Sequence, residues 1–142
     1  MRILAVVGGS GGHVTPVVAV LQEIKKSHPR SEIRFWCDKK FSSQARGLLS
    51  QLDSNIPVHT IMAGKFRRYN HLSLLRQLLW PSVVLKNLRD LIFVFFGFIQ
   101  SLCKLILWRP DVVFCKGGYV CLPVGVAAHL LHIPLVIHDS NA

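Results

Sequence analysis

Acidic residues are scarce in this chain of 142 residues, in which seven Asp and Glu stand against 17 Lys and Arg for a formal net charge of +10. Such an excess of positive charge favours anionic partners: nucleic acid, phosphorylated substrates or acidic lipid headgroups. Internal repeats, low-complexity tracts and an interdomain linker are also missing. The length suits one domain that buries a core of its own.

Paired cysteines are missing as well. None of the four forms a Cys-x-x-Cys motif, and no histidine cluster has zinc-finger spacing, so we expect no metal site and buried, reduced thiols. The N-terminus lacks a signal peptide, because Arg2 is followed by a short apolar run and then by glycines, which favours a cytoplasmic protein. The cysteines are Cys37, Cys103, Cys115 and Cys121.

Hydrophobic residues make up 51% of the chain and fall into two alternating patterns. Short apolar runs predict strands at 3–7, 33–37, 57–62, 111–115 and 135–138. Helical periodicity predicts helices at about 16–26, 45–52, 82–108 and 123–131. This alternation predicts an α/β fold with a Rossmann-like, doubly wound parallel sheet.

The predicted helix Ser82–Trp108 is apolar nearly all round in its middle. Its stretch Leu91–Trp108 is slightly short of the roughly 20 residues that cross a bilayer, and it contains polar residues. A crossing would also put strands of one sheet on opposite sides of the membrane. We therefore expect either a core helix or a helix that partly faces the bilayer.

The residues Gly8–His13 predict a phosphate-binding loop between the first strand and the first helix. Glycines let the backbone approach a ligand closely, and the helix N-terminus directs N–H groups and a positive dipole end to the same place. A tight turn without a ligand is the alternative. The dinucleotide pattern fails because Val14 stands where glycine is needed, and the Walker pattern fails at Gly12-His13-Val14.

His13 lies at the start of the helix, beside the predicted anion. The helix dipole disfavours a cation there, which suits a neutral imidazole. A general base and a simple contact to phosphate or sugar are both compatible with this position.

Two more polar segments follow predicted strands. Lys116-Gly117-Gly118-Tyr119 follows the fourth strand and His138-Asp139-Ser140-Asn141 the fifth, at the edge where open α/β sheets bind ligands. An ordinary turn and a helix-capping turn are the alternatives. His129 and His132, three residues apart, are expected to be surface or core histidines and not metal ligands.

A basic and apolar segment lies between the third strand and the long helix. Aliphatic side chains, tryptophan and cations together suit contact with an anionic membrane surface. Nucleic-acid binding would need more exposed aromatic residues and more even basic coverage, so it is not expected. A solvated basic face is the alternative. The candidate residues are Lys65, Arg67, Arg68, Leu72, Leu75, Arg76, Leu79 and Trp80, with Lys86 and Arg89 nearby.

Taken together, four motifs resemble the N-terminal half of the MurG family of peripheral membrane glycosyltransferases. They occur in the family's order along the whole chain. The motifs are Gly8-Gly9-Ser10-Gly11-Gly12-His13-Val14-x-Pro16, Pro110-Asp111-Val112-Val113, Gly117-Gly118-Tyr119-Val120 with Pro123, and Ile133-Pro134 leading to His138-Asp139-Ser140-Asn141-Ala142.

The resemblance implies the acceptor domain of a GT-B fold and a C-terminal donor domain that is missing here, since the sequence stops where the family continues. The implied reaction moves N-acetylglucosamine from UDP-GlcNAc to the polyprenyl-diphosphate-linked acceptor, lipid I, to give lipid II for peptidoglycan synthesis. It needs no cofactor or metal and takes place at the cytoplasmic face of the cell membrane. The isolated chain is expected to be inactive.

The resemblance also implies roles for single residues. His13 would be the base that deprotonates the acceptor, and His138 and Asp139 would support it. The residues implied to contact UDP-GlcNAc and diphosphate are Ser10, Gly11, Gly12, Gly117, Gly118, Tyr119 and Asn141.

The chain departs from the family at four of these motif positions. Asp139 replaces a usual Glu, which weakens any direct catalytic role for that carboxylate, and Ser140 replaces a usual Gln. Ser10 replaces Thr but keeps the hydroxyl, and Thr15 replaces an aromatic residue.

Two other functions remain open. One is a non-catalytic, membrane-recruiting subunit of a split glycosyltransferase. The other is an unrelated nucleotide-binding α/β module in which Asp38, after the second strand, holds a ribose.

Overall fold

The computed structural model describes residues 1–8, 14–64 and 81–138, with side chains from residue 84 onward in the last range. Its strands form one five-stranded sheet in the order β3-β2-β1-β4-β5, and every neighbouring pair is parallel. This order is typical of a Rossmann-like sheet, so the predicted fold class is confirmed. The strands are β1 (Arg2–Val7), β2 (Glu32–Cys37), β3 (Val58–Thr60), β4 (Val112–Lys116) and β5 (Leu135–His138).

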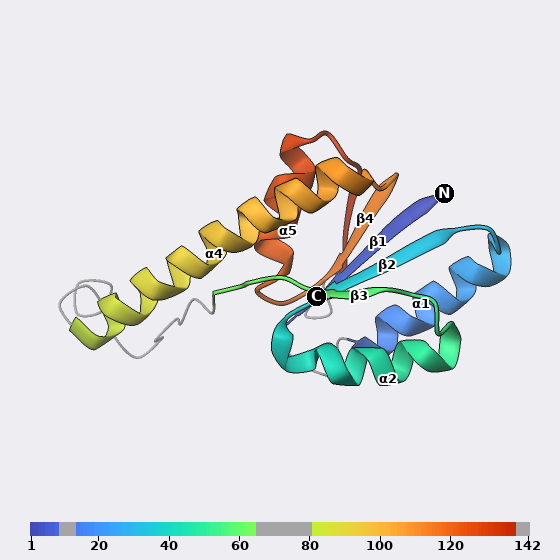
Figure 1. Cartoon of the computed structure of the whole chain (residues 1–142), viewed down its shortest axis with the longest axis horizontal. Helices are drawn as coiled ribbons and strands as arrows, with labels where there is room; N and C mark the ends of the chain where they lie inside the picture. The colour runs from blue at the N-terminus through green and yellow to red at the C-terminus, as the bar shows by residue number, and fades with distance from the viewer. Residues whose placement is uncertain (9–13, 65–80, 139–142) are drawn as a thin grey trace.

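Helices cover both faces of the sheet (Figure 1). On one face α1 (Val14–Ser27) and α2 (Ser42–Leu52) follow β1 and β2, with a short 3-10 turn η2 (Lys39–Phe41) before α2. On the other face lie α4 (Pro81–Trp108) and α5 (Cys121–Leu130). The alternating side chains of β1 serve both layers, because Ala5 and Val7 pack in the α1–α2 core and Leu4 and Val6 in the α4–α5 core.

Most element boundaries differ by one to three residues from the predicted ones, and three of the differences bear on the site. The third strand ends at Thr60, because the Gln100 side chain donates to the Thr60 carbonyl (3.1 Å) and accepts from the Met62 N–H (3.1 Å). The fourth strand extends to Lys116, which pairs in register with Val7. Helix α5 begins at Cys121, ahead of the predicted Pro123, and proline fits there because the N–H groups of a first turn need no helical partner.

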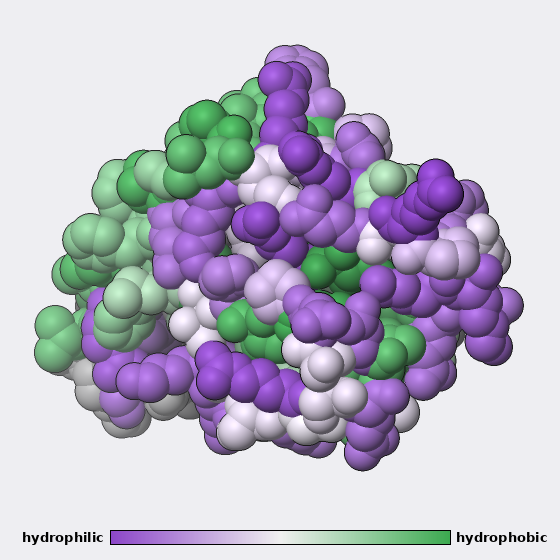
Figure 2. All heavy atoms as spheres, turned by 45° about the vertical axis from the view of Figure 1, so that its right-hand side comes forward, coloured by the Kyte–Doolittle hydropathy of each residue, from purple (hydrophilic) through white to green (hydrophobic). Residues whose placement is uncertain are grey.

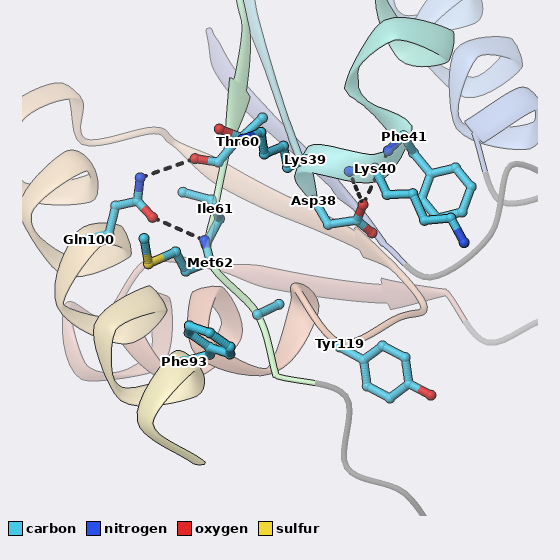
Figure 3. A pocket seen from close by; sticks show the side chains of 11 residues that line it. Asp38, Lys39, Lys40, Phe41, Thr60, Ile61, Met62, Phe93, Gln100 and Tyr119 are labelled. Carbon is cyan, nitrogen blue, oxygen red and sulfur yellow. Dashed lines mark hydrogen bonds between the residues drawn. The ribbon is translucent and has the colours of Figure 1, made fainter. Parts of the chain in front are cut away.

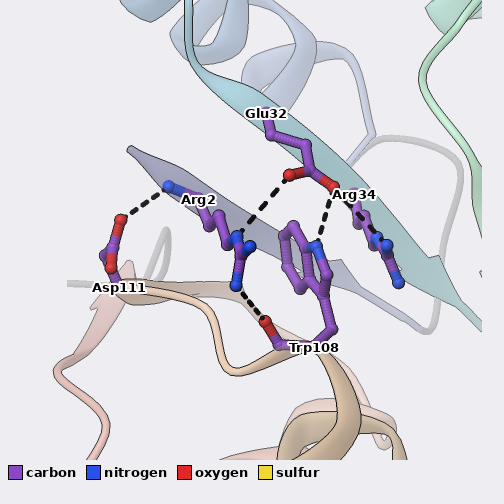
Figure 4. Close-up of polar contacts among 5 residues, drawn as sticks. All are labelled: Arg2, Glu32, Arg34, Trp108 and Asp111. Atoms are coloured by element: carbon purple, nitrogen blue, oxygen red, sulfur yellow. Dashed lines mark hydrogen bonds and ion pairs between the residues drawn. The ribbon is translucent and has the colours of Figure 1, made fainter.

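The C-terminal end of α4 is fastened to the amino edge of the sheet (Figure 4). The guanidinium of Arg2 donates to the Trp108 carbonyl (3.1 Å), and the Trp108 indole N–H donates to Glu32 (2.7 Å). The Arg34 guanidinium stacks 4.3 Å from the centre of the Trp108 ring, and the Arg2 backbone N–H donates to Asp111 (2.7 Å). These contacts fix where the long helix leaves the sheet.

Most of α4 is exposed. Its stretch Val84–Trp108 is long and apolar enough to cross a membrane and contains an 18-residue window with a mean hydropathy of 2.1, yet only 22% of that window is buried. The expectation of a core helix is therefore wrong for most of its surface. The strands before and after it, β3 and β4, belong to one sheet, as the argument against a crossing required. The buried positions form a narrow stripe: Asp90, Gly97, Ser101, Leu105 and Trp108.

Candidate functional site

Strands β1, β4 and β5 end side by side at the carboxyl edge of the sheet. Their last residues, Val7, Lys116 and His138, are neighbours in register. Helix α1 begins beyond β1 at Val14, and a glycine turn begins directly after Lys116. Ligands of open α/β sheets bind at this kind of edge, so the edge is the candidate site.

The glycine turn after β4 packs against the chain that leaves β1. Gly117 and Gly118 have φ angles of 56° and 84°, in the left-handed region. A Cβ atom on Gly118 would overlap the carbonyl oxygen of Gly8, and a Cβ on Gly8 would lie 3.0 Å from a methyl group of Val120. Gly8 and the turn at Gly117–Gly118, which follow two different strands, therefore lie against each other at the edge where the sequence predicts ligand binding.

Two cysteines, Cys115 and Cys121, lie next to this turn and are joined by a hydrogen bond. The Cys121 thiol donates to the Gly117 carbonyl (2.8 Å), and a hydrogen bond with Cys121, together with burial, raises the pKa of Cys115 far above its usual range.

Burial and the nearby Asp38 carboxylate also raise the pKa of Cys37, to about 11. Cys115 and Cys37 therefore stay protonated at neutral pH and are poor nucleophiles.

The expectation for the cysteines holds in part. All four are free thiols, as predicted. The prediction that all would be buried is right only for Cys37 and Cys115, because Cys121 is half-buried and Cys103 is exposed, off the narrow inner stripe of α4.

A cavity of about 500 Å³ opens at the carboxyl ends of β2 and β3. Phe93 and Gln100 of α4 line one side and the residues of η2 the other, with Tyr119 at the margin (Figure 3). Lys39 and Lys40 contribute cations, whereas Met62, Phe93 and other residues contribute apolar atoms. A cavity of this composition suits an amphiphilic, anionic ligand.

Asp38, which lines the same cavity, has a structural role that the sequence patterns did not predict. Its carboxylate accepts hydrogen bonds from the backbone N–H groups of Lys40 (2.9 Å) and Phe41 (3.2 Å), so it caps the turn η2. The cap occupies one oxygen of the carboxylate that the nucleotide-binding alternative assigned to a ribose.

Many predicted site residues lie outside the described residues, and their roles stay predictions. They are Ser10, Gly11, Gly12 and His13 of the first loop, Asp139 and Asn141 after β5, and the membrane candidates Lys65, Arg67, Arg68, Leu72, Leu75, Arg76, Leu79 and Trp80.

The predicted histidines of the described part are all on the surface. His138 ends β5 with an exposed side chain, and His129 and His132 are exposed as well. Within residues 1–8, 14–64 and 81–138, no group of three potential metal ligands is present.

An apolar surface on α4 is broader than the sequence patterns predicted. Hydrophobic atoms gather on the left of Figure 2, the side on which α4 lies in Figure 1, while the rest of that face is mostly hydrophilic. In the sequence, the continuously apolar stretch that begins at Leu91 was the feature that could have predicted this surface. Large exposed side chains of this surface are Val84, Leu85, Leu88, Leu91, Ile92, Phe93, Phe95, Phe96 and Ile99.

Comparison with known proteins places these features in one family. A family model described as the glycosyltransferase family 28 N-terminal domain matches residues 3–142. The chain is 37% identical over 134 residues to the UDP-N-acetylglucosamine--N-acetylmuramyl-(pentapeptide) pyrophosphoryl-undecaprenol N-acetylglucosamine transferase of Legionella pneumophila, covering 94% of this chain and 32% of that protein. It is 34% identical over 142 residues to the protein of the same name from Listeria monocytogenes, covering all of this chain and 34% of that protein.

The fold has a solved counterpart. The crystal structure of Acinetobacter baumannii MurG superposes with a TM-score of 0.70 at 24% sequence identity, covering 99% of this chain and 35% of that one. The expected resemblance to the MurG family and the GT-B type of fold are confirmed. The chain spans about a third of the length of the curated relatives that it matches.

Proposed function

The chain belongs to the family of glycosyltransferase family 28 N-terminal domains, and from this premise we propose that it is the acceptor-binding part of an inverting N-acetylglucosamine transferase. The donor is UDP-GlcNAc, the acceptor is lipid I and the product is lipid II. The relatives in Legionella and Listeria bear names that describe such a transfer to a pyrophosphoryl-undecaprenol acceptor. A C-terminal donor domain completes the site.

The observation that carries the proposal is the contact between the chain after β1 and the turn after β4. Gly8 and Gly118 touch backbone to backbone at the carboxyl edge. Backbone N–H groups in such turns, with the N-termini of α1 and α5 behind them, attract phosphate oxygens. A diphosphate is a substituent of both proposed substrates.

The proposed chemistry is a single displacement. His13 takes the proton from the acceptor's 4-hydroxyl, the oxygen attacks the anomeric carbon, and the bond to UDP breaks with its electron pair on the leaving diphosphate. Ser10, Gly11, Gly12, Gly117, Gly118, Tyr119 and Asn141 bind the donor and the diphosphate, and His138 and Asp139 assist. Electrostatic stabilisation by N–H groups acts on the charge that develops on the leaving group.

The proposed acceptor is amphiphilic, which gives the remaining surfaces a role. The cavity beside α4 combines lysines with apolar side chains, and Phe93 both lines this cavity and belongs to the exposed apolar surface of α4. We propose that α4 and the segment 65–80 rest on the cytoplasmic face of an anionic membrane, so that a lipid-linked acceptor reaches the carboxyl edge along the helix.

The test is a lipid I to lipid II assay on detergent-solubilised or vesicle-bound acceptor. We expect no transfer by the 142-residue chain alone, and transfer when the chain is fused to the remaining C-terminal part of the Legionella relative. In that fusion, His13→Ala is expected to lower turnover about a hundredfold or more, because a positioned base is lost, while UDP-GlcNAc binding stays near the original value.

Each part of this test has a result that would contradict the proposed function. Transfer by the isolated chain would refute the need for a donor domain, and near-normal turnover of His13→Ala would remove His13 as the base. A fusion that stays inactive while the isolated chain activates a separate donor subunit would favour the split-glycosyltransferase alternative.

A further inference from the structure

Lys116 is a buried residue at the centre of the carboxyl edge, and its ammonium reaches the surface there, because Nζ has no hydrogen-bond partner in the described residues and is not among their fully buried atoms. It ends β4, between Val7 of β1 and His138 of β5, and only 5% of the residue is exposed. The buried stem of this side chain fixes a positive charge at the edge, and a charge held in a partly covered place favours an anion nearby.

The side chain of Lys116 leaves the sheet on the face covered by α1. Side chains alternate along a strand, and Cys115 packs in the α4–α5 core whereas Phe114 packs against the α1–α2 core. Lys116 therefore shares its face with Phe114 and with its register neighbour Val7. Val14, the first residue of α1, belongs to the same core, so the N-terminus of α1 lies on this face.

The described residues offer Lys116 no acidic partner. No hydrogen bond or ion pair joins its ammonium to another residue in the described ranges. The acidic side chains of the described residues form ion pairs with other cations or accept hydrogen bonds from backbone N–H groups. The cations in these ion pairs are Arg2, Lys25, Lys26, Arg34 and Arg89. The residues engaged in this way are Glu23, Glu32, Asp38, Asp53, Asp90 and Asp111; Asp139 lies outside the described residues.

The first turn of α1 favours an anion at the same place. It contains no acidic side chain, and a helix of 14 residues directs a positive dipole end toward the edge. On the other side, the left-handed Gly117 and Gly118 follow Lys116 directly, so backbone can come close to a ligand there. Lys116, the N-terminus of α1 and the glycine turn therefore lie at the same edge of the sheet.

We propose that Lys116 is a diphosphate-binding residue, whose ammonium supplies the counter-charge for a phosphate held between the N-terminus of α1 and the turn at Gly117–Gly118. The proposal rests on the proposed function, in which a diphosphate reaches this edge. The diphosphate is that of the nucleotide donor or that of the polyprenyl acceptor, and the two share this chemistry. Lysine binds phosphate as a compact point charge, which suits a site that needs no bidentate geometry.

Calorimetric titration of the 142-residue chain tests the proposal with three probes: inorganic pyrophosphate, UDP and geranyl diphosphate. We expect Lys116→Met to weaken binding of at least one probe about tenfold or more, since a charge-assisted contact is lost. Lys116→Arg keeps the charge and is expected to retain most of the affinity. Lys26→Met, an exposed lysine at the far end of α1, is the matched control and is expected to leave binding unchanged.

The pattern of losses identifies the source. A loss for UDP alone assigns Lys116 to the donor, a loss for geranyl diphosphate alone assigns it to the acceptor, and a loss for both supports a shared position. Equal binding by Lys116→Met and the original chain would overturn the proposal, and so would the absence of binding of all three probes at millimolar concentration.

Thermal unfolding without ligand separates anion binding from a structural role. Methionine can fill the place of the buried lysine stem, and the ammonium has no acidic partner among the described residues, so we expect Lys116→Met to leave Tm unchanged or to raise it. A lower Tm would mean that Lys116 pairs with an acid of the chain, such as Asp139, and would overturn the proposal. The lipid II assay measures transfer directly, so a failure here leaves the proposed function standing, and a failure there leaves this binding result intact.

Discussion

Two glycines of this chain show how the same residue can be required at one position and costly at another. Gly118 has a φ angle of 84° and lies against the Gly8 carbonyl, so neither its backbone conformation nor its surroundings admit a side chain. Gly47 lies in the exposed middle of α2, where an added methyl group would meet no atom within 4 Å. The motif at Gly117–Gly118 predicted a turn, but its contact with Gly8 depends on the pairing of β1 with β4.

We expect Gly118→Ala to destabilise the fold by roughly 2 kcal/mol or more, from the left-handed backbone and the overlap with Gly8. Gly47→Ala is the control and is expected to stabilise it by about 0.5–1 kcal/mol, because alanine is the better helix former. Urea unfolding of both variants measures the free energies. A neutral Gly118→Ala would contradict the close approach of Gly118 to Gly8.

At the scale of elements, α4 differs from its neighbours in how little of it the domain covers. Its inner stripe contains the small residues Gly97 and Ser101, and a Cβ on Gly97 would overlap the carbonyl oxygen of Met62. The helix therefore lies close to the chain after β3, where Gln100 holds the backbone of Thr60 and Met62. Phe95 and Phe96 remain more than half exposed, which is unusual for a folded domain in water.

We expect Phe95→Glu to lower partition of the chain onto vesicles with anionic lipid about tenfold, since burial of an aromatic side chain in the interface is lost and a negative charge is added. Val20→Glu is the matched control: Val20 is an exposed apolar residue of α1, on the other face of the sheet. Vesicle co-sedimentation measures both. Equal losses in the two variants would indicate that α4 is not the contacting surface.

At the scale of the whole molecule, the net charge of +10 adds a long-range attraction to the apolar contact. Charge attracts the chain to an acidic surface over about a Debye length, which shrinks from about 10 Å at 0.1 M salt to about 3 Å at 1 M. The apolar surface of α4 acts only on contact and does not depend on screening in this way.

Binding to vesicles rich in acidic lipid is therefore expected to weaken several-fold between about 0.1 and 1 M salt and to level off at a residual value. Binding to zwitterionic vesicles is expected to equal that residual value and to change little with salt. Co-sedimentation over a salt series measures both curves. A salt-independent curve on acidic vesicles would refute the electrostatic contribution.

Much of this protein is determined locally. Apolar runs and helical periodicity predicted each strand and helix of the described sheet, because burial on one or two faces imposes those periods on any sequence. The glycine turns were predictable for the same local reason, since only glycine adopts left-handed backbone without cost. The family motifs carried the proposed chemistry of the residues that lie beyond the described ranges.

Tertiary structure decided what depends on which strands become neighbours. The order β3-β2-β1-β4-β5 brings Gly8 against Gly118, aligns Lys116 with Val7 and His138, and buries a lysine that looked like part of a loop. It also decided that α4 buries only a narrow stripe, because a periodicity can show that a helix is apolar but not which of its faces another element covers. The turn at Gly117–Gly118 thus depends on its own residues, whereas its contact with Gly8 depends on the pairing of β1 with β4.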